Sequence, residues 1–214
     1  MANKAKRQYD NSYPSVTQVL DCLRKIGLEF WFKNNTLAFI TQASEKGKLI
    51  GIQIHEAIQA HIETGEVKLE TKYPDEVINA LKSFMLFKKE HPEIKLRRSE
   101  MMLTSLIYGY NGTMDVEGEI SLLVVPGDWK SGEAKERDRP VIYPEYIYQV
   151  AAYLKAFNEV KEQKATEAFI AVLAKDKVAY NYQLFTEEEI NEAFNEVFLS
   201  ALKIKKYQMR KGIR

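Results

Sequence analysis

The sequence predicts an α/β fold in which a mixed β-sheet is flanked by helices on both faces. Of its 214 residues, 45% are hydrophobic and 29% are charged, a balance typical of a folded globular protein. Helical patterns come first, strand patterns follow, and a helix, two strands and a helix end the chain. No repeat, low-complexity tract or linker interrupts it. We therefore expect one domain, 1–214, with a motif-bearing core at about 44–160, a helical segment 1–43 before it and a hairpin and helix 165–214 after it.

Three helices are expected in the first 90 residues. The first spans 15–26 and ends at Gly27. The second spans about 44–63, because Ser44 is a good N-cap and isoleucines then recur every four residues from 50 to 62. The third begins at Pro74-Asp75-Glu76, where acidic side chains suit the positive end of a helix, and it stops at about 90, before a proline.

Three strands are expected next, at about 94–104, 106–116 and 119–130, because β-branched and aromatic residues dominate there. Glu117-Gly118 is a turn signal, so the last two strands should form a hairpin. Pro126 precedes Gly127 near the end of this region. Since proline cannot donate to a ladder, the strand should be bulged or at an edge there.

The remaining elements follow the same local signals. Residues 131–142 are polar and charged, which predicts a loop, and a helix should run from Tyr143-Pro144 to about 160. Segments 166–175 and 177–185 resemble a hairpin that turns at Asp176-Lys177. Thr186, followed by three glutamates, forms a capping box that opens a final helix.

Composition excludes several classes of protein. The chain has 31 Lys+Arg and 30 Asp+Glu, a net charge of +1, so any nucleic-acid surface must be local. The sequence contains no apolar run of about 18 residues, so we expect no membrane-spanning helix. No apolar segment follows the basic start, so we expect no secretory signal there. The single Cys22 excludes an intrachain disulfide and a four-cysteine iron–sulfur cluster. We expect a reducing, cytoplasmic setting (a host cytoplasm if the chain is viral).

The strongest chemical signal is a pair of charged residues at the end of a predicted strand. Asp128 and Lys130 face the same way, because side chains alternate along a strand. Asp115 lies 13 residues earlier and can approach Asp128 across the hairpin, whose strands lie about 5 Å apart. Two close carboxylates repel unless a cation lies between them, and oxygen ligands suit Mg²⁺ or Mn²⁺. The alternatives are a surface ion pair and a solvated acid.

Glu100 is a second candidate. By alternation it shares a face with Leu96 and Met102, which should point inward. An inward carboxylate needs a partner or a metal, because burying it unpaired is costly. The alternative is a salt bridge to Arg97 or Arg98.

Two helical pairs add candidates. His55 lies four residues after Gly51, so the two share one face of the helix. The glycine would let a ligand approach this face closely, and the imidazole could ligate a metal. Gln149 and Tyr153 have the same spacing, and an amide with a phenol can hold a phosphate or order a carboxylate. The alternatives are a helix histidine beside an apolar stripe and the edge of an amphipathic helix.

These motifs occur in one order: G-x-x-x-H, S-E, G-T-M-D, D-W-K-S-G and Q-x-x-x-Y. Over about residues 13 to 157, the chain resembles the RecB-like branch of the PD-(D/E)xK nuclease superfamily. The opening P-S-V-T-Q-V-L is similar to the first helix of phage-type and mitochondrial-type single-strand DNA exonucleases in that branch. The resemblance implies a restriction-endonuclease-like core. Pro126-Gly127 departs from it, because the family usually keeps an apolar strand there.

The resemblance also implies a role for each motif residue. His55, Asp115 and Asp128 would be metal ligands, with the Trp129 carbonyl completing the shell. Lys130 would be the catalytic lysine, and Glu100 an accessory acid that contacts metal-bound water or helps to position the metal; Asp128 would also take part in catalysis. Gln149, Tyr153 and Ser131 would support the site or the DNA backbone.

The implied function is a Mg²⁺- or Mn²⁺-dependent DNA exonuclease without an iron–sulfur cluster. It would hydrolyse phosphodiester bonds at DNA ends or on single strands, in repair, recombination or replication. The alternatives are a catalytically silent module that binds DNA or protein, and a structure-specific endonuclease.

Three segments could contact DNA. The last twelve residues contain six basic groups and no acid, although basic C-termini are often only solvated. The 131–142 loop has three basic residues, which acids balance. Phe30, Trp31 and Phe32 could stack bases, but core packing is the more common role of such a cluster.

Overall fold

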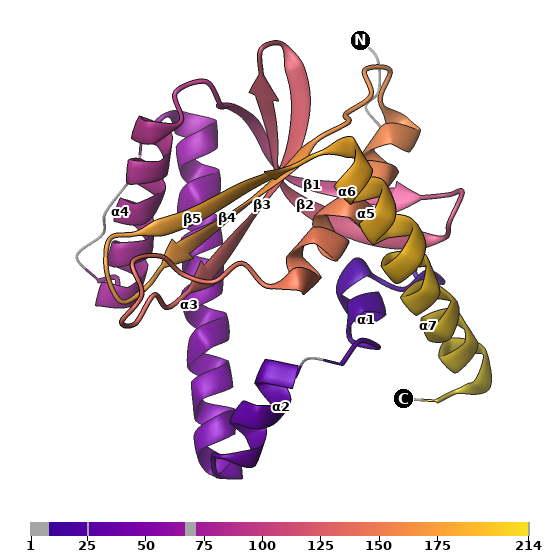
Figure 1. The fold of residues 1–214 in the computed structure, drawn as a ribbon, viewed down its shortest axis with the longest axis horizontal. Helices are drawn as coiled ribbons and strands as arrows, with labels where there is room; N and C mark the ends of the chain where they lie inside the picture. The colour runs from indigo at the N-terminus through magenta and orange to yellow at the C-terminus, as the bar shows by residue number, and fades with distance from the viewer. Residues whose placement is uncertain (1–8, 25, 67–71, 214) are drawn as a thin grey trace.

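A five-stranded mixed sheet with helices on both faces forms the fold, as the sequence predicts (Figure 1). The computed structural model describes residues 9–24, 26–66 and 72–213. The strand order is β1-β2-β3-β4-β5, in which only the β3–β4 pair is parallel. The strands are β1 (Lys95–Ser105), β2 (Tyr110–Ile120), β3 (Leu123–Gly132), β4 (Ala168–Ala174) and β5 (Tyr180–Phe185).

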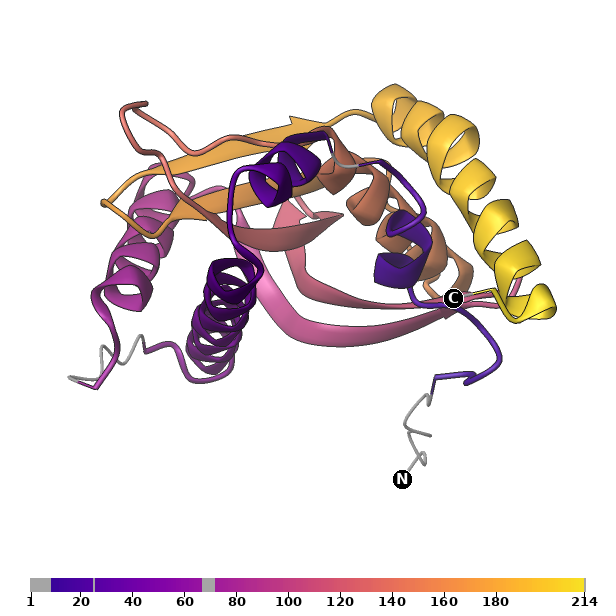
Figure 2. The same ribbon diagram turned by 90° about the horizontal axis from the view of Figure 1, so that it is seen from below.

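The helices divide between two hydrophobic clusters. The helical elements are α1 (Val16–Leu20), α2 (Ile26–Lys33), α3 (Leu37–Thr64), α4 (Asp75–Glu90), α5 (Pro144–Val160), α6 (Glu187–Glu192), the π-helix η1 (Ala193–Phe198) and α7 (Leu199–Lys211). One cluster, here the α5 core, joins α1, α5 and η1 to the sheet through residues such as Tyr110 and Phe194. The other, the α3–α4 core, packs Phe84 and Phe87 against Trp129. Figure 2 shows α3 with α4 and α5 with α7 at opposite ends of the view.

The N-terminal helices differ most from the sequence prediction. Ser15 caps α1 in a capping box with Gln18, but the helix ends at Leu20 instead of Ile26. Gly27 then lies inside α2, which the sequence did not predict. The N-cap of the next helix, α3, is Thr36, eight residues before the expected Ser44, and the Thr36 side chain accepts a hydrogen bond from the Phe39 N–H.

The β2–β3 turn lies at Ser121-Leu122, so its prediction at Glu117-Gly118 was wrong. Both turn residues have left-handed backbones, with φ of +49° and +69°. Gly118 lies inside β2 opposite Val125. A Cβ there would lie 3.2 Å from the Phe169 ring. This glycine makes room for packing between distant residues, which a local turn signal cannot distinguish from a turn.

Pro126 stands at a local edge of a central strand. It pairs with Glu117 of β2, whereas pairing with β4 begins only at Gly127, which lies opposite Phe169. A Cβ on Gly127 would lie 2.2 Å from the Phe169 ring, so only glycine fits beneath that ring. Pro126 therefore lies where β3 pairs with β2 alone, and Gly127 is the first residue of β3 that also pairs with β4.

The C-terminal elements follow the prediction closely. Helix α5 has Pro144 in its first turn, and β4 pairs antiparallel with β5. Thr186 and Glu189 form the predicted capping box. Helices α6, η1 and α7 are continuous and form a rod, residues 187–211 (Figure 1). No helix within the described residues is long and apolar enough to cross a membrane.

Candidate functional site

Three ligand-type side chains from three elements meet at one point. His55 comes from α3, Glu100 from β1 and Asp115 from β2. His55 Nδ1 lies 3.8 Å from Glu100 Oε1 and 3.6 Å from Asp115 Oδ2. One ligand atom from each residue lies within 4.8 Å of the others. The sequence analysis named all three, and the fold brings them together.

Glu100 reaches this cluster through an irregular backbone. It lies between Ser99, which pairs with Val116, and Met101, which pairs with Met114, so it stands opposite Asp115. Its φ is +50°, a left-handed value that is uncommon for glutamate and that concentrates at functional sites.

Glu100 itself is exposed, so the inward orientation predicted for it was wrong. Met102, which was expected to point inward, is 45% exposed. The predicted alternative partners of Glu100 are engaged elsewhere. Arg97 pairs with Glu119 and Arg98 with Glu117.

A second, closed group lies beside the first. Asp128 is fully buried, and its Oδ2 forms an ion pair with Lys130 Nζ. Gln149 Nε2 donates to Asp128 Oδ1 at 3.2 Å and to the Tyr153 hydroxyl at 2.8 Å. Gly112 makes room for this arrangement, because a Cβ there would lie 2.6 Å from the Tyr153 ring. The Asp128–Lys130 pair is therefore a buried ion pair and not a surface one.

Asp115 links the two groups. Its Oδ2 accepts a hydrogen bond from the Trp129 N–H at 2.8 Å. Its neighbours Met114 and Val116 belong to the α5 core and the α3–α4 core respectively, so Asp115 lies where β2 passes from one core to the other. Burial first, and then the charge of Asp128, raise the pKa of Asp115 to about 8.

The two cations of the site respond to these acids. Burial alone would lower the pKa of His55, but Glu100, Asp115 and Asp128 outweigh it and the net shift is upward. Burial likewise opposes the charge of Lys130, but Asp128 and Asp115 raise the pKa of this ammonium. Lys130 therefore carries a full positive charge at neutral pH.

The donor set fits a divalent cation. The charge of Asp128 is close enough to raise the pKa of Asp115, so two buried carboxyl groups lie near each other here. Carboxylate oxygens and one imidazole suit Mg²⁺ or Mn²⁺. The resemblance implied His55, Asp115 and Asp128 as the ligands, but the residues that meet are His55, Glu100 and Asp115. The two carboxylate oxygens of Asp128 face Lys130 and Gln149 instead.

The roles of Trp129 and Ser131 remain predictions. Trp129 donates its N–H to Asp115, and the role of its carbonyl rests on the resemblance alone. Ser131 lies in β3 opposite Leu173. Because side chains alternate along a strand, it shares the face of Trp129 and points away from Lys130.

An open groove of about 590 Å³ leads to the cluster. Nothing lies within 4 Å of a Cβ on Gly51, so the space beside His55 is open to a ligand. The groove is lined by Lys48, Gly51, Ile52, His55, Glu56, Gln59, Glu100 and Asp115.

One neighbour of the site was missed by the sequence analysis. Lys130 Nζ lies 5.6 Å from the centre of the Tyr146 ring, within reach of a cation–π contact. Tyr146, Gln149 and Tyr153 are spaced i, i+3 and i+7 on α5, so helical spacing could have found the first from the other two.

The N-terminal aromatic cluster is not core. Phe30 is 70% exposed and Phe32 is 43% exposed, so the core-packing interpretation was wrong for both. Trp31 is half-buried against Phe39, where it fastens α2 to α3.

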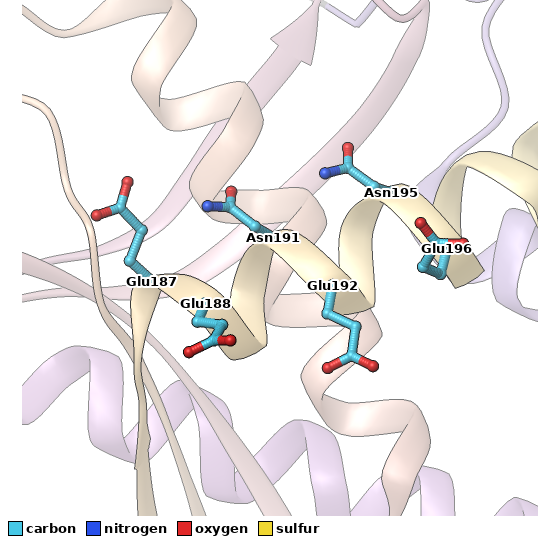
Figure 3. Close-up of a pocket in the computed structure, with 6 residues that line it drawn as sticks. All are labelled: Glu187, Glu188, Asn191, Glu192, Asn195 and Glu196. Carbon is cyan, nitrogen blue, oxygen red and sulfur yellow. The ribbon is translucent and has the colours of Figure 1, made fainter.

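A second hollow, of about 620 Å³, lies along α6 and η1 and has a different character (Figure 3). Its lining contains four glutamates and two asparagines: Glu187, Glu188, Asn191, Glu192, Asn195 and Glu196. None of these residues belongs to the cluster around His55.

The chain matches no known protein family and no curated protein. Among solved structures it is similar to the crystal structure of SSO0001. The two are 11% identical, with a TM-score of 0.46, and the alignment covers 95% of this chain and 79% of that chain. This likeness carries no functional inference.

Proposed function

We propose that this protein is a Mg²⁺- or Mn²⁺-dependent deoxyribonuclease that hydrolyses phosphodiester bonds, acting as an exonuclease on DNA ends or single strands. One observation carries the proposal. His55, Glu100 and Asp115 converge within 4.8 Å, and a lysine paired with a buried aspartate lies beside them. That combination offers a cation site next to a fixed positive charge, and both can stabilise the charge that develops during phosphodiester hydrolysis. The family resemblance supplies DNA as the substrate.

In this proposal the open group holds the cation. His55, Glu100 and Asp115 would be its side-chain ligands, and Asp128, whose Oδ2 pairs with Lys130, would lie beside them. A bound divalent cation supplies a Lewis acid and lowers the pKa of water. Asp115 must release its proton for the cation to bind, because ligation requires the carboxylate.

The closed group holds Lys130 in position. Its raised pKa keeps the ammonium charged, so Lys130 acts by stabilising negative charge on the phosphate oxygens and not by accepting a proton. Asp128 fixes this ammonium, Gln149 fixes Asp128, and Tyr153 fixes Gln149. A charge held before the reaction costs no reorganisation in the transition state.

The proposal is tested with end-labelled single-stranded DNA, linear and covalently closed, with and without magnesium. We expect progressive degradation of the linear strand, only with the metal, and resistance of the circle. Rapid cutting of circles into discrete fragments would indicate the endonuclease. Binding of both substrates without any cutting would favour the silent module. The Lys130→Ala variant, prepared in parallel, excludes a contaminating nuclease.

A further inference from the structure

The C-terminal rod has strongly polarised charge. Its first half, residues 187–198, contains five glutamates and no basic residue. Its second half, from 199 onward, contains five basic residues within the described chain and no acid. The acidic half faces the hollow of Figure 3. An anionic polymer that approaches the rod is therefore repelled by one half and attracted by the other.

Helix-end electrostatics explain only part of this pattern. Acids in the first turn of α6 and bases in the last turn of α7 complement the helix dipole. Glu192, Glu196 and Lys203 lie in the middle of the rod, beyond the reach of either end. Their charges continue the polarity without that benefit, so the polarity extends over the whole surface of the rod.

The basic half presents its cations to solvent. Lys203, Tyr207 and Arg210 are spaced i, i+4 and i+7, so they share one face of α7, and Lys211 lies near them. All four are exposed, on the side away from the buried Ala201 and Leu202. In the part of the chain that the structure describes, no ion pair engages Lys203, Arg210 or Lys211. These cations remain available for a partner.

This face has a fixed relation to the cation cluster. Lys206 Nζ donates to the Tyr108 carbonyl in the turn after β1, which fastens α7 to the β1–β2 hairpin. Glu100 lies on the same β1, five residues before its end at Ser105. At about 3.3 Å per residue, the strand covers about 17 Å between them. The α7 face lies beyond the end of that strand, so a polymer that reaches both places needs more than about five nucleotide steps, at roughly 3.4 Å each.

We infer that the outer face of α7, formed by Lys203, Tyr207, Arg210 and Lys211, is a second nucleic-acid contact that binds the phosphate backbone away from the hydrolytic centre. This inference extends the proposed nuclease function. A polyanion fits the row of unpaired cations, and Tyr207 among them offers a ring on which a base can stack. A lipid surface is the competing occupant, because Ile204, Met209 and Ile213 of the same segment are also exposed, and the vesicle measurement below tests it.

The test compares two matched double variants by DNA binding without metal. K203Q/K211Q removes two charges from the α7 face, and K82Q/K89Q removes two exposed lysine charges from α4. Binding of a long fluorescent oligo(dT) strand is measured in EDTA at several salt concentrations. We expect K203Q/K211Q to lower the slope of log affinity against log salt by about 1.4, since each single-strand phosphate contact contributes about 0.7. The α4 variant should keep the parental slope.

Two readouts separate this inference from the nuclease proposal. A small chromogenic phosphodiester cannot span the distance to α7, so its hydrolysis should be unchanged in K203Q/K211Q. If DNA is never cut but K203Q/K211Q still weakens binding selectively, the second contact stands and the nuclease proposal fails. Equal slopes for the two double variants would overturn the second contact. Binding to phosphatidylserine vesicles, with no binding to oligo(dT), would also overturn it.

Discussion

The two halves of the candidate site differ in how firmly the protein holds them. In the open half, the side chains of His55 and Glu100 are 31% and 36% exposed, and the groove reaches them directly. In the closed half, Asp128 is 1% exposed and Lys130 is 21% exposed. The open half is built to accept something from solvent, whereas the closed half holds a charge that is already in place. Asp115, which contacts the Trp129 N–H and His55, belongs to both.

This difference has an energetic origin. Burying Asp128 is tolerable because Lys130 neutralises it and Gln149 donates to it. In the open half the Asp115 carboxylate is not neutralised in the same way, because burial and the neighbouring Asp128 raise its pKa to about 8. A divalent cation would supply the missing positive charge. The halves should therefore respond to mutation through different observables.

The largest expected effect tests the closed half. Lys130→Ala should lower the cleavage rate by about 10²–10³, the range for loss of one preorganised charge at a developing anion. DNA affinity and Mn²⁺ affinity should stay near the parental values, because this residue acts in the transition state and is not a ligand. Cleavage rates are measured at saturating magnesium, DNA affinity in EDTA and Mn²⁺ affinity in magnesium-free buffer, at a temperature where circular dichroism shows a folded protein.

A matched control accompanies this variant. Lys135, on the loop after β3, forms a surface ion pair with Glu133, away from the candidate site, so Lys135→Ala should cleave normally. Removal of Lys130 also leaves Asp128 buried without its counter-charge, which should lower the melting temperature. A Lys130→Ala protein that cleaves at the parental rate would mean that the closed half is not catalytic.

The next effect tests the open half. His55→Ala should weaken Mn²⁺ binding by about 10–100-fold, a loss already seen when only an outer partner of a metal site is changed. Calorimetric titration with Mn²⁺ measures this without any DNA. His91→Ala is the control, because His91 contacts Glu93 and Tyr180 instead of the cluster. Equal Mn²⁺ affinity in the parent and in His55→Ala would remove the imidazole from the proposed ligand set.

The third prediction concerns how the stability of the protein depends on pH through Asp115. Its pKa of about 8 in the folded protein exceeds the ordinary 3.8, so the folded state binds this proton more tightly. The resulting stability is present at low pH and is lost as pH rises through about 8. In EDTA, Asp115→Asn should therefore gain melting temperature relative to the parent between pH 6 and pH 9.

The size of that gain can be bounded. A difference of about 1 kcal/mol shifts the melting temperature of a domain this large by about 2–4 °C. Added Mn²⁺ should raise the melting temperature of the parent at pH 9 and leave Asp115→Asn nearly unchanged. Parallel pH curves for the two proteins in EDTA would show that the Asp115 carboxyl carries no such penalty.

The sequence predicted the β2–β3 and β4–β5 hairpins from local patterns, whereas the meeting of His55 with Asp115 was implied by the family resemblance. It expected Glu100 to point inward with Leu96 and Met102, whereas Glu100 and Met102 are exposed and the register of β1 shifts between Leu96 and Arg98. It misplaced the hairpin turn because Gly118 makes room for Phe169, a contact across 51 residues of chain. It assigned Phe30 to the core because aromatic residues are usually buried, and no local signal indicates an exposed helix. Long-range packing supplied what short-range patterns could not.

The smallest expected effect tests how far the closed half extends from Lys130. The Tyr153 hydroxyl accepts a hydrogen bond from Gln149 Nε2, so Tyr153→Phe removes one partner of the amide that holds Asp128. One such bond contributes about 0.5–1.5 kcal/mol. The control is Tyr110→Phe, which removes a similarly buried hydroxyl that donates to the Ala152 carbonyl in the same core. Both variants should lose comparable stability, but only Tyr153→Phe should slow cleavage, by up to about tenfold, since 1.4 kcal/mol corresponds to that factor. If the two variants cleave equally well, Tyr153 serves the α5 core alone and the closed half ends at Gln149.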